Sequence, residues 1–523
     1  MTDSQQPEAR VAPYSWYALG VLTLVYLVNF VDRQILSILA NDIKADLGLD
    51  DAQLGFLYGT AFAIFYALFG IPLGRLADTW SRTRLLAVGL ALWSGMTAMS
   101  GLARGFGTLA VARIGVGVGE ATASPCAYSL ISDLFPQHRR AIALSIYSAG
   151  LFLGSGLSLV AGAAIVQAWN AAWPTGGPGG LVGWQAAFLA VGLPGLLLAF
   201  WVLSLREPDR GRMDGLPVPP TERPWGAFLQ QILLIIPPFT LIGAMRGGSK
   251  AVLQNLASAA VIALTAVALA HLTGDGAQFG LLGVGVYAVV SWAAALRRDD
   301  APTFDLTIRS PVFMALVFVY GAVSYVGYTL TYWAAPFAER TYALGKLETG
   351  LWIGAPAAVG GFVGVIAGGW LADRLHGRFL AGRPLVLLLG VLGPVPLVLL
   401  AYGGTQVRTF LVCSFLLQMV TSSALGCAAA ATQALVLPQM RGTATAIFFL
   451  GATLLGLGLG PFMAGYLSER SGDLGFGVRA SLIMALPGVL ALLYAIRNYA
   501  TAVARMHSAA SVPDQHATRD TAA

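Results

Sequence analysis

GRLAD at residues 74–78 returns as GWLAD at residues 369–373, and this repeat decides how the chain is organised. Two further landmarks recur in the same order: PQHR at 136–139 with PQMR at 438–441, and LPG at 193–195 with LPG at 486–488. The three offsets are similar, at 295, 302 and 293 residues. One shared tripeptide would carry little weight, but three in register indicate duplication. The sequence therefore predicts two halves of similar structure.

The apolar composition places both halves in a membrane. Of the 523 residues, 57% are hydrophobic and 11% are charged, whereas soluble domains carry about 25% charged residues. The mean hydropathy is +0.72. Apolar stretches recur from Tyr17 almost to the C-terminus, each with the roughly 20 residues that cross a bilayer core as helix. These features predict an all-α membrane protein.

About 14 spans are predicted. The first half holds six, at about 17–40, 53–77, 84–103, 106–132, 140–168 and 184–205. The second half holds six more, at about 310–335, 348–372, 383–403, 408–435, 442–468 and 478–498. Between the halves lie two further apolar runs, 252–272 and 277–296, behind a Pro-containing stretch at 225–245. We place that stretch in or near the membrane interface, and interpret the two inserted spans as a peripheral pair outside the transport core.

This plan gives five regions: a cytoplasmic segment 1–16, a six-helix bundle 17–205, a central linker with the two extra spans 206–309, a second six-helix bundle 310–498, and a cytoplasmic tail 499–523. The first dozen residues lack the features of a signal peptide, so the N-terminus is expected to stay in the cytoplasm. The basic residues that flank the insertion then also lie inside. An arginine-rich chain with three lysines suggests a bacterial source. We therefore expect a bacterial inner membrane protein with both termini cytoplasmic.

Duplicated bundles suit alternating access, because a site between two similar halves can open to either side when one rocks against the other. A receptor or a membrane enzyme has no need of this symmetry. We therefore predict a secondary transporter rather than an enzyme.

Several motifs resemble those of a known superfamily. GRLADTWSRTR at 74–84, with a degenerate copy GGWLADRLHGR at 368–378, is similar to the loop between the second and third helices of major facilitator superfamily transporters. Within that superfamily, NFVDRQILSIL at 29–39 and RIGVGVGEA at 113–121 resemble the Spinster family, as do 53–78 and 129–147. The resemblance implies the major facilitator fold. It also implies carriage of lysophospholipids or sphingoid phosphates, often coupled to protons.

Four charges lie deep within predicted spans: Asp32, Arg33, Arg113 and Glu120. A charge inside the hydrocarbon region is costly, so each is a functional candidate. Asp32 and Arg113 reach similar depths from opposite ends, which makes an ion pair between them possible. A proton, an arginine and a substrate can compete for one buried carboxylate. We expect Asp32 and Glu120 to be proton sites and Arg33 or Arg113 to hold an anionic head group. The alternative is a permanent salt bridge that only fixes helix packing.

Two further sets complete the predicted site. The second half lacks deep charges but offers an aromatic and weakly polar wall that suits an acyl chain or aromatic body: Tyr320, Tyr325, Tyr328, Gln418, Thr421 and Ser422. Interfacial anchoring is the competing explanation for its tyrosines. Small and charged residues at the cytoplasmic ends of spans are expected to form a gate: Gly74, Asp78, Arg82, Arg84, Asp133, Arg139, Gly369, Asp373, Arg374, Arg378 and Arg441. Its glycines should let helices approach closely, and plain topology-setting charge is the alternative for its arginines.

Other chemistry is not indicated. Cys126, Cys413 and Cys427 are isolated in apolar context, so neither a disulfide nor a metal is implied, and no cofactor is expected. The net charge of +6 flanks the spans, which argues against nucleic acid. We expect a monomer in the lipid bilayer that handles a small amphiphilic substrate and protons. An exporter or porter of small organic anions or hydrophobic drugs is the second interpretation, and a non-transporting sensor the third.

Overall fold

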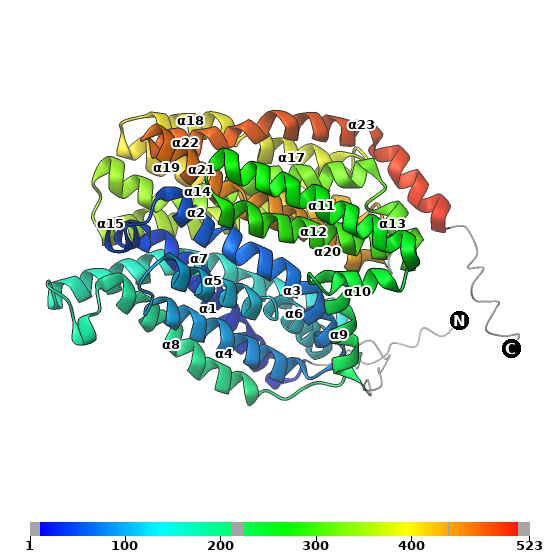
Figure 1. Cartoon of the computed structure of the whole chain (residues 1–523), viewed down its shortest axis with the longest axis horizontal. Coiled ribbons are helices and arrows are strands. Elements are labelled where there is room, and N and C mark those ends of the chain that lie inside the picture. Colours follow the sequence, from blue (N-terminus) through cyan, green and yellow to red (C-terminus); the bar gives the residue numbers. More distant parts are fainter. Residues whose placement is uncertain (1–10, 212, 214–222, 438–439, 511–523) are drawn as a thin grey trace, which may run out of the picture.

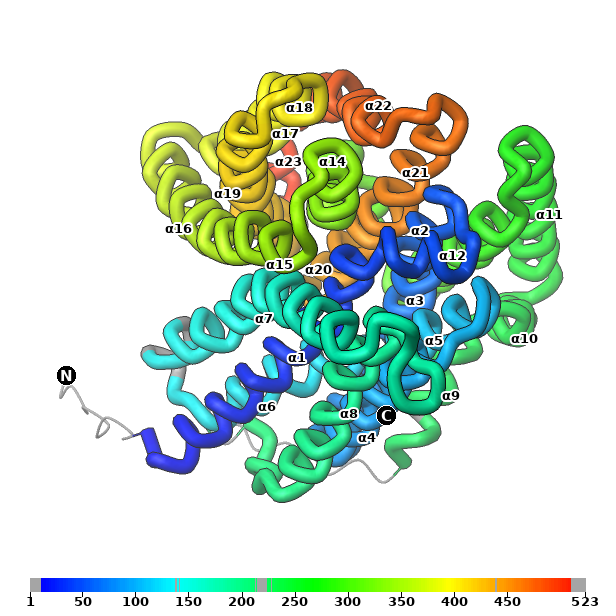
Figure 2. Tube along the Cα trace, turned by 90° about the vertical axis from the view of Figure 1, so that its left-hand side faces the viewer, coloured from blue at the N-terminus to red at the C-terminus, as the bar shows by residue number. Residues whose placement is uncertain are grey.

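A computed structural model describes residues 11–211, 213, 223–437 and 440–510 of the chain, and all regular structure in them is helical. The long helices lie side by side along the long axis of the molecule (Figure 1). Seen along that axis, they form two bundles with a small group on one flank (Figure 2). We name the two ends of the bundles after the sequence prediction: α1 begins at the predicted cytoplasmic end and finishes at the predicted external end.

The first bundle contains α1 (Pro13–Leu47), α2 (Asp51–Tyr58), α3 (Thr60–Thr79), α4 (Arg82–Ser100), α5 (Phe106–Glu120), α6 (Ala123–Leu134), α7 (Gln137–Ala172), η1 (Pro178–Gly180) and α8 (Gly183–Leu203). The flanking group contains α9 (Pro224–Ile235), α10 (Thr240–Met245), α11 (Gly248–Thr273), α12 (Gly276–Asp299) and α13 (Ala301–Leu306).

The second bundle contains α14 (Pro311–Tyr342), α15 (Lys346–Thr349), η3 (Gly350–Gly354), α16 (Ala355–His376), α17 (Gly382–Leu392), α18 (Pro394–Gly403), α19 (Val407–Gln433), α20 (Arg441–Gly451), η5 (Ala452–Leu457), α21 (Gly460–Ser471), α22 (Leu474–Ala480), η6 (Ser481–Met484) and α23 (Ala485–Ala510). The segments η3 and η5 are π-helical turns within longer helical spans.

Twelve helical segments of the described chain are long and apolar enough to cross a membrane. They include both inserted helices, α11 and α12. The two predicted spans missing from that set, 84–103 and 106–132, correspond to α4 and to the pair α5 and α6. The protein is an all-α integral membrane protein, and its helices are compatible with the prediction of about 14 spans.

The interruption between α5 and α6 places two of the deep charges. Helix α5 lies very close to its neighbours: a Cβ on Gly117 would lie 2.6 Å from the carbonyl oxygen of Phe62 in α3, and one on Gly119 would lie 2.8 Å from that of Gly89 in α4. Only glycine permits such an approach. The helix ends at Glu120, so the predicted single span 106–132 is broken at residues 121–122. Arg113 and Glu120 are thereby held in the interior of the first bundle.

The inserted helices differ in their surroundings. Helix α11 is outermost, and most of its apolar side chains are exposed, as expected for a lipid-facing helix (Figure 2). Helix α12 lies between α11 and the bundles, where it packs against α3 of the first half and η5 of the second. The short helices α9 and α10 follow the linker and pack on α3 and α11 respectively.

Candidate functional site

The centre of the first bundle holds a buried ion pair between Arg33 of α1 and Glu120 at the end of α5. Arg33 donates to one carboxylate oxygen of Glu120 through Nε at 3.0 Å and through Nη2 at 2.5 Å. Both side chains are almost completely buried. The guanidinium also lies over two aromatic rings, 4.7 Å from Phe30 and 4.5 Å from Phe62. Charge pairing and ring contacts therefore fix Arg33 together.

Asp32 and Arg113 lie beside this pair but do not form the ion pair that the sequence suggested. Arg113, which is fully buried, donates weakly to two backbone carbonyl oxygens, those of Leu57 and Asp32, both at 3.4 Å. Neither carboxylate oxygen of Asp32 accepts a hydrogen bond from a described residue. The Asp32–Arg113 ion pair that the sequence made possible is not formed in this state, because the guanidinium is directed at the peptide group of Asp32 instead of its side chain.

Several other buried polar atoms surround the four charges without hydrogen-bond partners among the described residues. Trp93 and Ser94 of α4 face Asp32, and Asn29 of α1 faces Glu120. The second oxygen of Glu120 and one amino group of Arg113 are also unpaired. Buried polar groups in folded proteins are nearly always satisfied. This concentration of buried polar groups around four charges makes the centre of the first half a candidate functional site.

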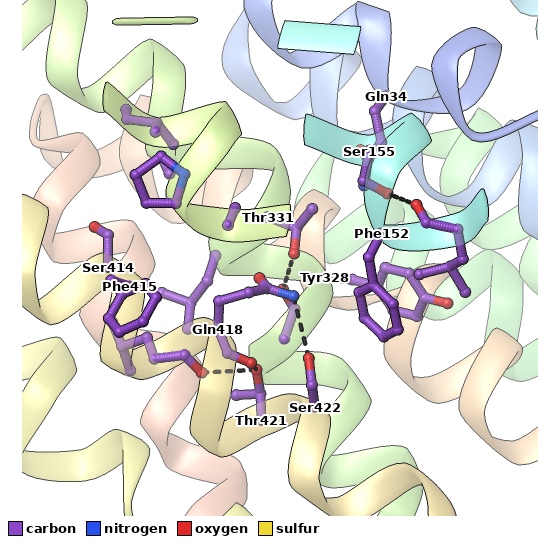
Figure 3. A pocket seen from close by; sticks show the side chains of 18 of the residues that line it. Gln34, Phe152, Ser155, Tyr328, Thr331, Ser414, Phe415, Gln418, Thr421 and Ser422 are labelled. Atoms are coloured by element: carbon purple, nitrogen blue, oxygen red, sulfur yellow. Dashed lines mark hydrogen bonds between the residues drawn. The ribbon is translucent and has the colours of Figure 1, made fainter. Parts of the chain in front are cut away.

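A cavity of about 200 Å³ lies between the two bundles (Figure 3). Its polar groups are uncharged, and most of its wall is apolar or aromatic. Gln34, Phe152 and Ser155 contribute from the first half, opposite Thr331 and Phe415 of the second. Of the six residues predicted to line a cavity, five do so: Tyr320, Tyr328, Gln418, Thr421 and Ser422. The amide of Gln418 donates to the hydroxyl of Ser422 at 3.2 Å.

Tyr325 does not line this cavity. Its side chain is buried, with 4% exposed, and the surrounding backbone packs against α21. Helical geometry explains the error, because Tyr325 lies one residue after Ser324 and is rotated away from the face that Tyr320, Ser324 and Tyr328 share. The prediction that Tyr320, Tyr325 and Tyr328 share one wall was therefore too broad.

Gln34 and Phe30 connect the cavity to the charged cluster. Gln34 follows Arg33 directly and lines the cavity, and its side-chain oxygen accepts a hydrogen bond of 2.5 Å from the hydroxyl of Tyr58. Phe30, which also lines the cavity, has its ring centre 4.7 Å from the Arg33 guanidinium. The Arg33 side chain itself is not part of the cavity wall in this state. Charge and cavity are adjacent but separated by the Arg33–Glu120 pair.

A second charged network joins the two halves at the predicted external end. The buried carboxylate of Asp51, at the start of α2, accepts from both terminal nitrogens of Arg340 in α14, at 2.7 and 2.9 Å. It also accepts from Lys44 and from Ser468 of α21, each at 2.7 Å. Nearby, Lys346 of α15 pairs with Asp42 of α1 at 2.6 Å. These contacts hold the bundles together at that end.

The comparisons with known proteins agree with this architecture. The sequence model of the Major Facilitator Superfamily matches residues 22–381. The chain belongs to the Major Facilitator Superfamily. It is therefore a transporter of this superfamily and not an enzyme.

Similar proteins indicate which family within the superfamily the chain resembles. An MFS-type efflux pump of Mycolicibacterium smegmatis is 28% identical over 92% of this chain and 91% of that protein. The sphingosine-1-phosphate transporter SPNS2 of Mus musculus is 24% identical over 86% of this chain and 69% of that protein. A bacterial homologue of the human lysosomal transporter Spinster, solved in an inward-facing and unoccupied conformation, has a TM-score of 0.70 at 24% identity, with 94% of this chain and 98% of that chain covered. The predicted resemblance to Spinster proteins is confirmed.

At the predicted cytoplasmic end, Arg82 of the major facilitator motif forms ion pairs with Asp133 and Glu207. Arg82 is fully buried and pairs with Asp133 of α6, and it donates to Glu207, beyond α8, at 2.7 Å. In the second half Asp373, the counterpart of Asp78, pairs with Arg383 at 3.4 Å. The other predicted gate side chains, those of Asp78, Arg84, Arg139, Arg374, Arg378 and Arg441, are exposed. Arg82 thus pairs with the first half and the start of the linker, and Asp373 pairs within the second half.

The gate glycines are not where helices touch most closely. A Cβ on Gly74 would meet only Pro125, at 3.9 Å, and one on Gly369 would meet nothing within 4 Å. The close approach falls one residue earlier, at Gly368, where a Cβ would clash with the backbone of Ser423 in α19. The prediction of close packing at Gly74 and Gly369 is therefore wrong, because both glycines face away from their neighbouring helices.

The external network and Gln34 were missed by the sequence reasoning. Lys44 and Lys346 are two of only three lysines, and each lies at the end of a predicted span beside acidic residues, which was an available signal. Gln34 is a polar residue inside the first predicted span, directly after Asp32 and Arg33. A search for polar residues at matching depths in the predicted spans would have indicated both the external network and Gln34.

Proposed function

We propose that this chain is a proton-coupled secondary active transporter. It works by alternating access and moves an amphiphilic anionic substrate of the lysophospholipid or sphingoid phosphate type. The observation that carries the proposal is the placement of the Arg33–Glu120 pair directly behind an uncharged, largely apolar cavity between the halves. The cavity suits an apolar body, and the guanidinium behind it suits an anionic head group.

The coupling step follows from competition for Arg33. A proton on Glu120 removes the charge that holds the guanidinium, which then becomes free to bind a phosphate or carboxylate bidentately. Asp32 is the second proton site. A buried carboxylate without a hydrogen-bond partner is costly while charged, and a proton is the simplest group that neutralises it. Substrate and the Glu120 carboxylate thus alternate on Arg33, and substrate binds when Glu120 carries a proton.

The lipid-like substrate is supported by chemistry and by relatives. The wall contributed by Tyr320, Tyr328 and Phe415 offers ring faces and few hydrogen bonds, whereas a sugar would require many. SPNS2, similar along 86% of this chain, is a sphingosine-1-phosphate transporter. A second candidate is export of small organic anions or hydrophobic drugs, which the match to the Mycolicibacterium smegmatis efflux pump favours.

We also propose a setting for this activity. The basic residues near the ends of α9 to α13 favour a bacterial cytoplasmic membrane with both termini inside. The site is built within one chain, so the protein is proposed to act as a monomer. Neither a cofactor nor nucleic acid enters the proposed cycle.

Purified protein in liposomes tests the proposal. We expect a pH gradient to drive uptake of a lysophospholipid or a sphingoid phosphate, and collapse of the gradient with a protonophore to remove that uptake. Uptake of an aromatic carboxylate but of no lysolipid would favour the second candidate. Lipid movement of equal rate with and without the gradient would contradict proton coupling.

A further inference from the structure

Helix α12 of the insertion lies along a seam between the two halves. On one side of this seam is α3, and on the other are η5 and α21. Ile64 and Leu68 of α3 form a small apolar cluster with Ala288 of α12, against which Leu454 of η5 packs. A Cβ on Gly285 of α12 would meet side-chain atoms of both Ile64 and Leu454, at 2.7 and 3.3 Å. The helix therefore packs against both halves along the same face.

One buried glutamine joins the three units by hydrogen bonds. Gln278, near the start of α12, is 1% exposed. Its amide nitrogen donates to the carbonyl oxygen of Gly458, just after η5, at 3.2 Å. The hydroxyl of Thr60, at the start of α3, lies 2.6 Å from the Gln278 side-chain oxygen and 2.5 Å from the same carbonyl of Gly458, and can donate to either. First half, insertion and second half thus share one polar contact.

The local structure explains why Gly458 is free to take part. The π-helical turn η5 ends at Leu457 and α21 begins at Gly460, so the regular pattern of helical hydrogen bonds is interrupted between them. Carbonyl groups at such an interruption need partners from elsewhere. Within an apolar seam, Thr60 and Gln278 supply them. Without these two side chains the Gly458 carbonyl would be buried and unsatisfied, which is costly.

The turn between α11 and α12 adds contacts with the second half at the predicted external end. Arg470, at the end of α21, donates to the carbonyl oxygen of Thr273 at 3.3 Å. Asp275 in the same turn is attracted by Arg470 of the second half and repelled by Asp50 of the first. Phe279 of α12 packs edge-on against Phe462 of α21, with ring centres 5.9 Å apart. The hydrogen bonds of α12 and of the turn before it to the two halves therefore lie near the external end, whereas the apolar contacts to both halves continue to Gly285 and Ala288 in the middle of the helix.

We propose that α12 is a clamp that holds the two halves closed at the predicted external end, with Gln278 as its central contact. In an alternating-access cycle, α3 and α21 must separate at that end. The hydrogen bonds that Gln278 shares with Thr60 and Gly458 cannot all survive this separation. The inserted helices therefore bias the transporter toward the externally closed state. This inference rests on alternating access as proposed above, but not on the substrate or on proton coupling.

Cysteine labelling tests the clamp without any transport measurement. Ser37 of α1 is buried at the junction of the halves, where its hydroxyl donates to the carbonyl oxygen of Tyr332 at 2.6 Å. In a protein whose three native cysteines are replaced by alanine, Ser37→Cys is accessible from outside only when the external end opens. Labelling by a membrane-impermeant maleimide in intact cells then reports that opening.

Two clamp variants are compared with a matched control. Gln278→Leu and Thr60→Val each remove one arm of the clamp with little change in size, and we expect both to raise the labelling rate about fivefold, the effect of one buried hydrogen bond. Asn255→Leu is the control, because Asn255 of α11 bonds only Ser291 and Tyr287 within the insertion. Its labelling rate should match that of the parent.

The possible labelling results distinguish failure of the clamp proposal from failure of alternating access. Equal labelling rates in the parent and in both clamp variants would overturn the clamp while leaving alternating access intact. An equal increase in all three variants would also overturn it, since general loosening of the insertion would then explain the effect. Absence of labelling in every protein, even after prolonged exposure, would contradict alternating access and the clamp together. Size-exclusion profiles verify that each variant is folded.

Discussion

At the scale of single residues, the proposed transport cycle requires Arg33 to bind first Glu120 and then the anionic head group of the substrate. In this structure it holds Glu120 through two nitrogen atoms. Lysine keeps the charge but cannot make two parallel hydrogen bonds. We therefore expect Arg33→Lys to weaken binding of a sphingoid phosphate about tenfold, or roughly 1.4 kcal/mol. Equilibrium binding in detergent measures this.

Arg309→Lys is the matched control, because Arg309 is exposed and pairs only with Asp305 one turn away. Its affinity should equal that of the parent protein. Equal affinity in Arg33→Lys as well would show that Arg33 does not hold the head group.

A second residue-scale prediction concerns Glu207. Burial alone would raise the pKa of its carboxyl, but hydrogen bonds from Thr83 and Arg82 outweigh burial and lower the pKa below its ordinary value. A lowered pKa in the folded state stabilises the protein above the unfolded pKa of about 4.3, and this contribution is lost as the pH falls through the folded value. Glu207→Gln should therefore destabilise the protein at pH 7 by about 1 kcal/mol, the usual worth of a helix N-cap.

Thermal unfolding in detergent between pH 7 and pH 3 measures the effect. The difference between parent and Glu207→Gln should shrink toward zero at the acid end. Glu348→Gln, at an exposed glutamate, should cause no difference at any pH. A constant difference for Glu207→Gln down to pH 3 would show that its charge is not what stabilises the start of α4.

At the scale of helices, the sequence predicts which segments form membrane spans better than it predicts which residues of those spans contact one another. Spans of about 20 apolar residues are recognisable because the bilayer imposes their length. The break after Glu120 was not recognisable, because it depends on how Gly117 and Gly119 fit against α3 and α4. The rotation that removes Tyr325 from the cavity is of the same kind: one residue decides the face, and span boundaries are uncertain by more than that.

The glycines of α16 give a helix-scale prediction. Gly368→Ala would place a methyl group against the backbone of Ser423, which cannot give way as a flexible side chain can. We expect a loss of about 1–3 kcal/mol, as for other overpacked sites. Gly369→Ala is the adjacent control, since nothing lies within 4 Å of its new methyl group.

Differential scanning fluorimetry of the two variants decides the matter. Gly368→Ala should melt several degrees below the parent, and Gly369→Ala should melt at or slightly above it, since alanine favours helix. Equal melting temperatures in the two variants would mean that α16 and α19 are not packed as closely as described.

At the scale of the whole molecule, the sequence predicts the two similar halves but not the contacts that join them. Motifs at 74–78 and 369–373 recur in the sequence, so two bundles follow directly. The network of Asp51, Arg340 and Lys44 joins residues almost 300 positions apart, and no local pattern links them. The four deep charges could be found because charge in a membrane span is rare. Their pairing could not, since it depends on how α1 and α5 are rotated.

Asp51 should control the external end. Removing one partner from a buried ion pair costs about 3–5 kcal/mol, and the partner Arg340 lies in the other half. We therefore expect Asp51→Asn to shift the protein toward an externally open state. Spin labels on Thr175→Cys and Thr405→Cys, exposed in loops of different halves at that end, should show a larger population of long distances.

Asp473→Asn is the control for Asp51→Asn. Asp473 pairs with Arg479 inside the second half and is partly exposed, so its loss should leave the distance distribution unchanged. If both variants match the parent, the Asp51 network is not the external lock.

We propose that Asp32 and Glu120 carry the protons that drive transport. Uptake of a lysolipid or sphingoid phosphate into liposomes under a pH gradient is the measurement that tests this proposal. We expect Glu120→Gln and Asp32→Asn each to abolish accumulation of a lysolipid or sphingoid phosphate driven by the gradient, while both variants remain folded by size-exclusion chromatography. Gradient-driven accumulation that persists at the parent rate in both variants would contradict it.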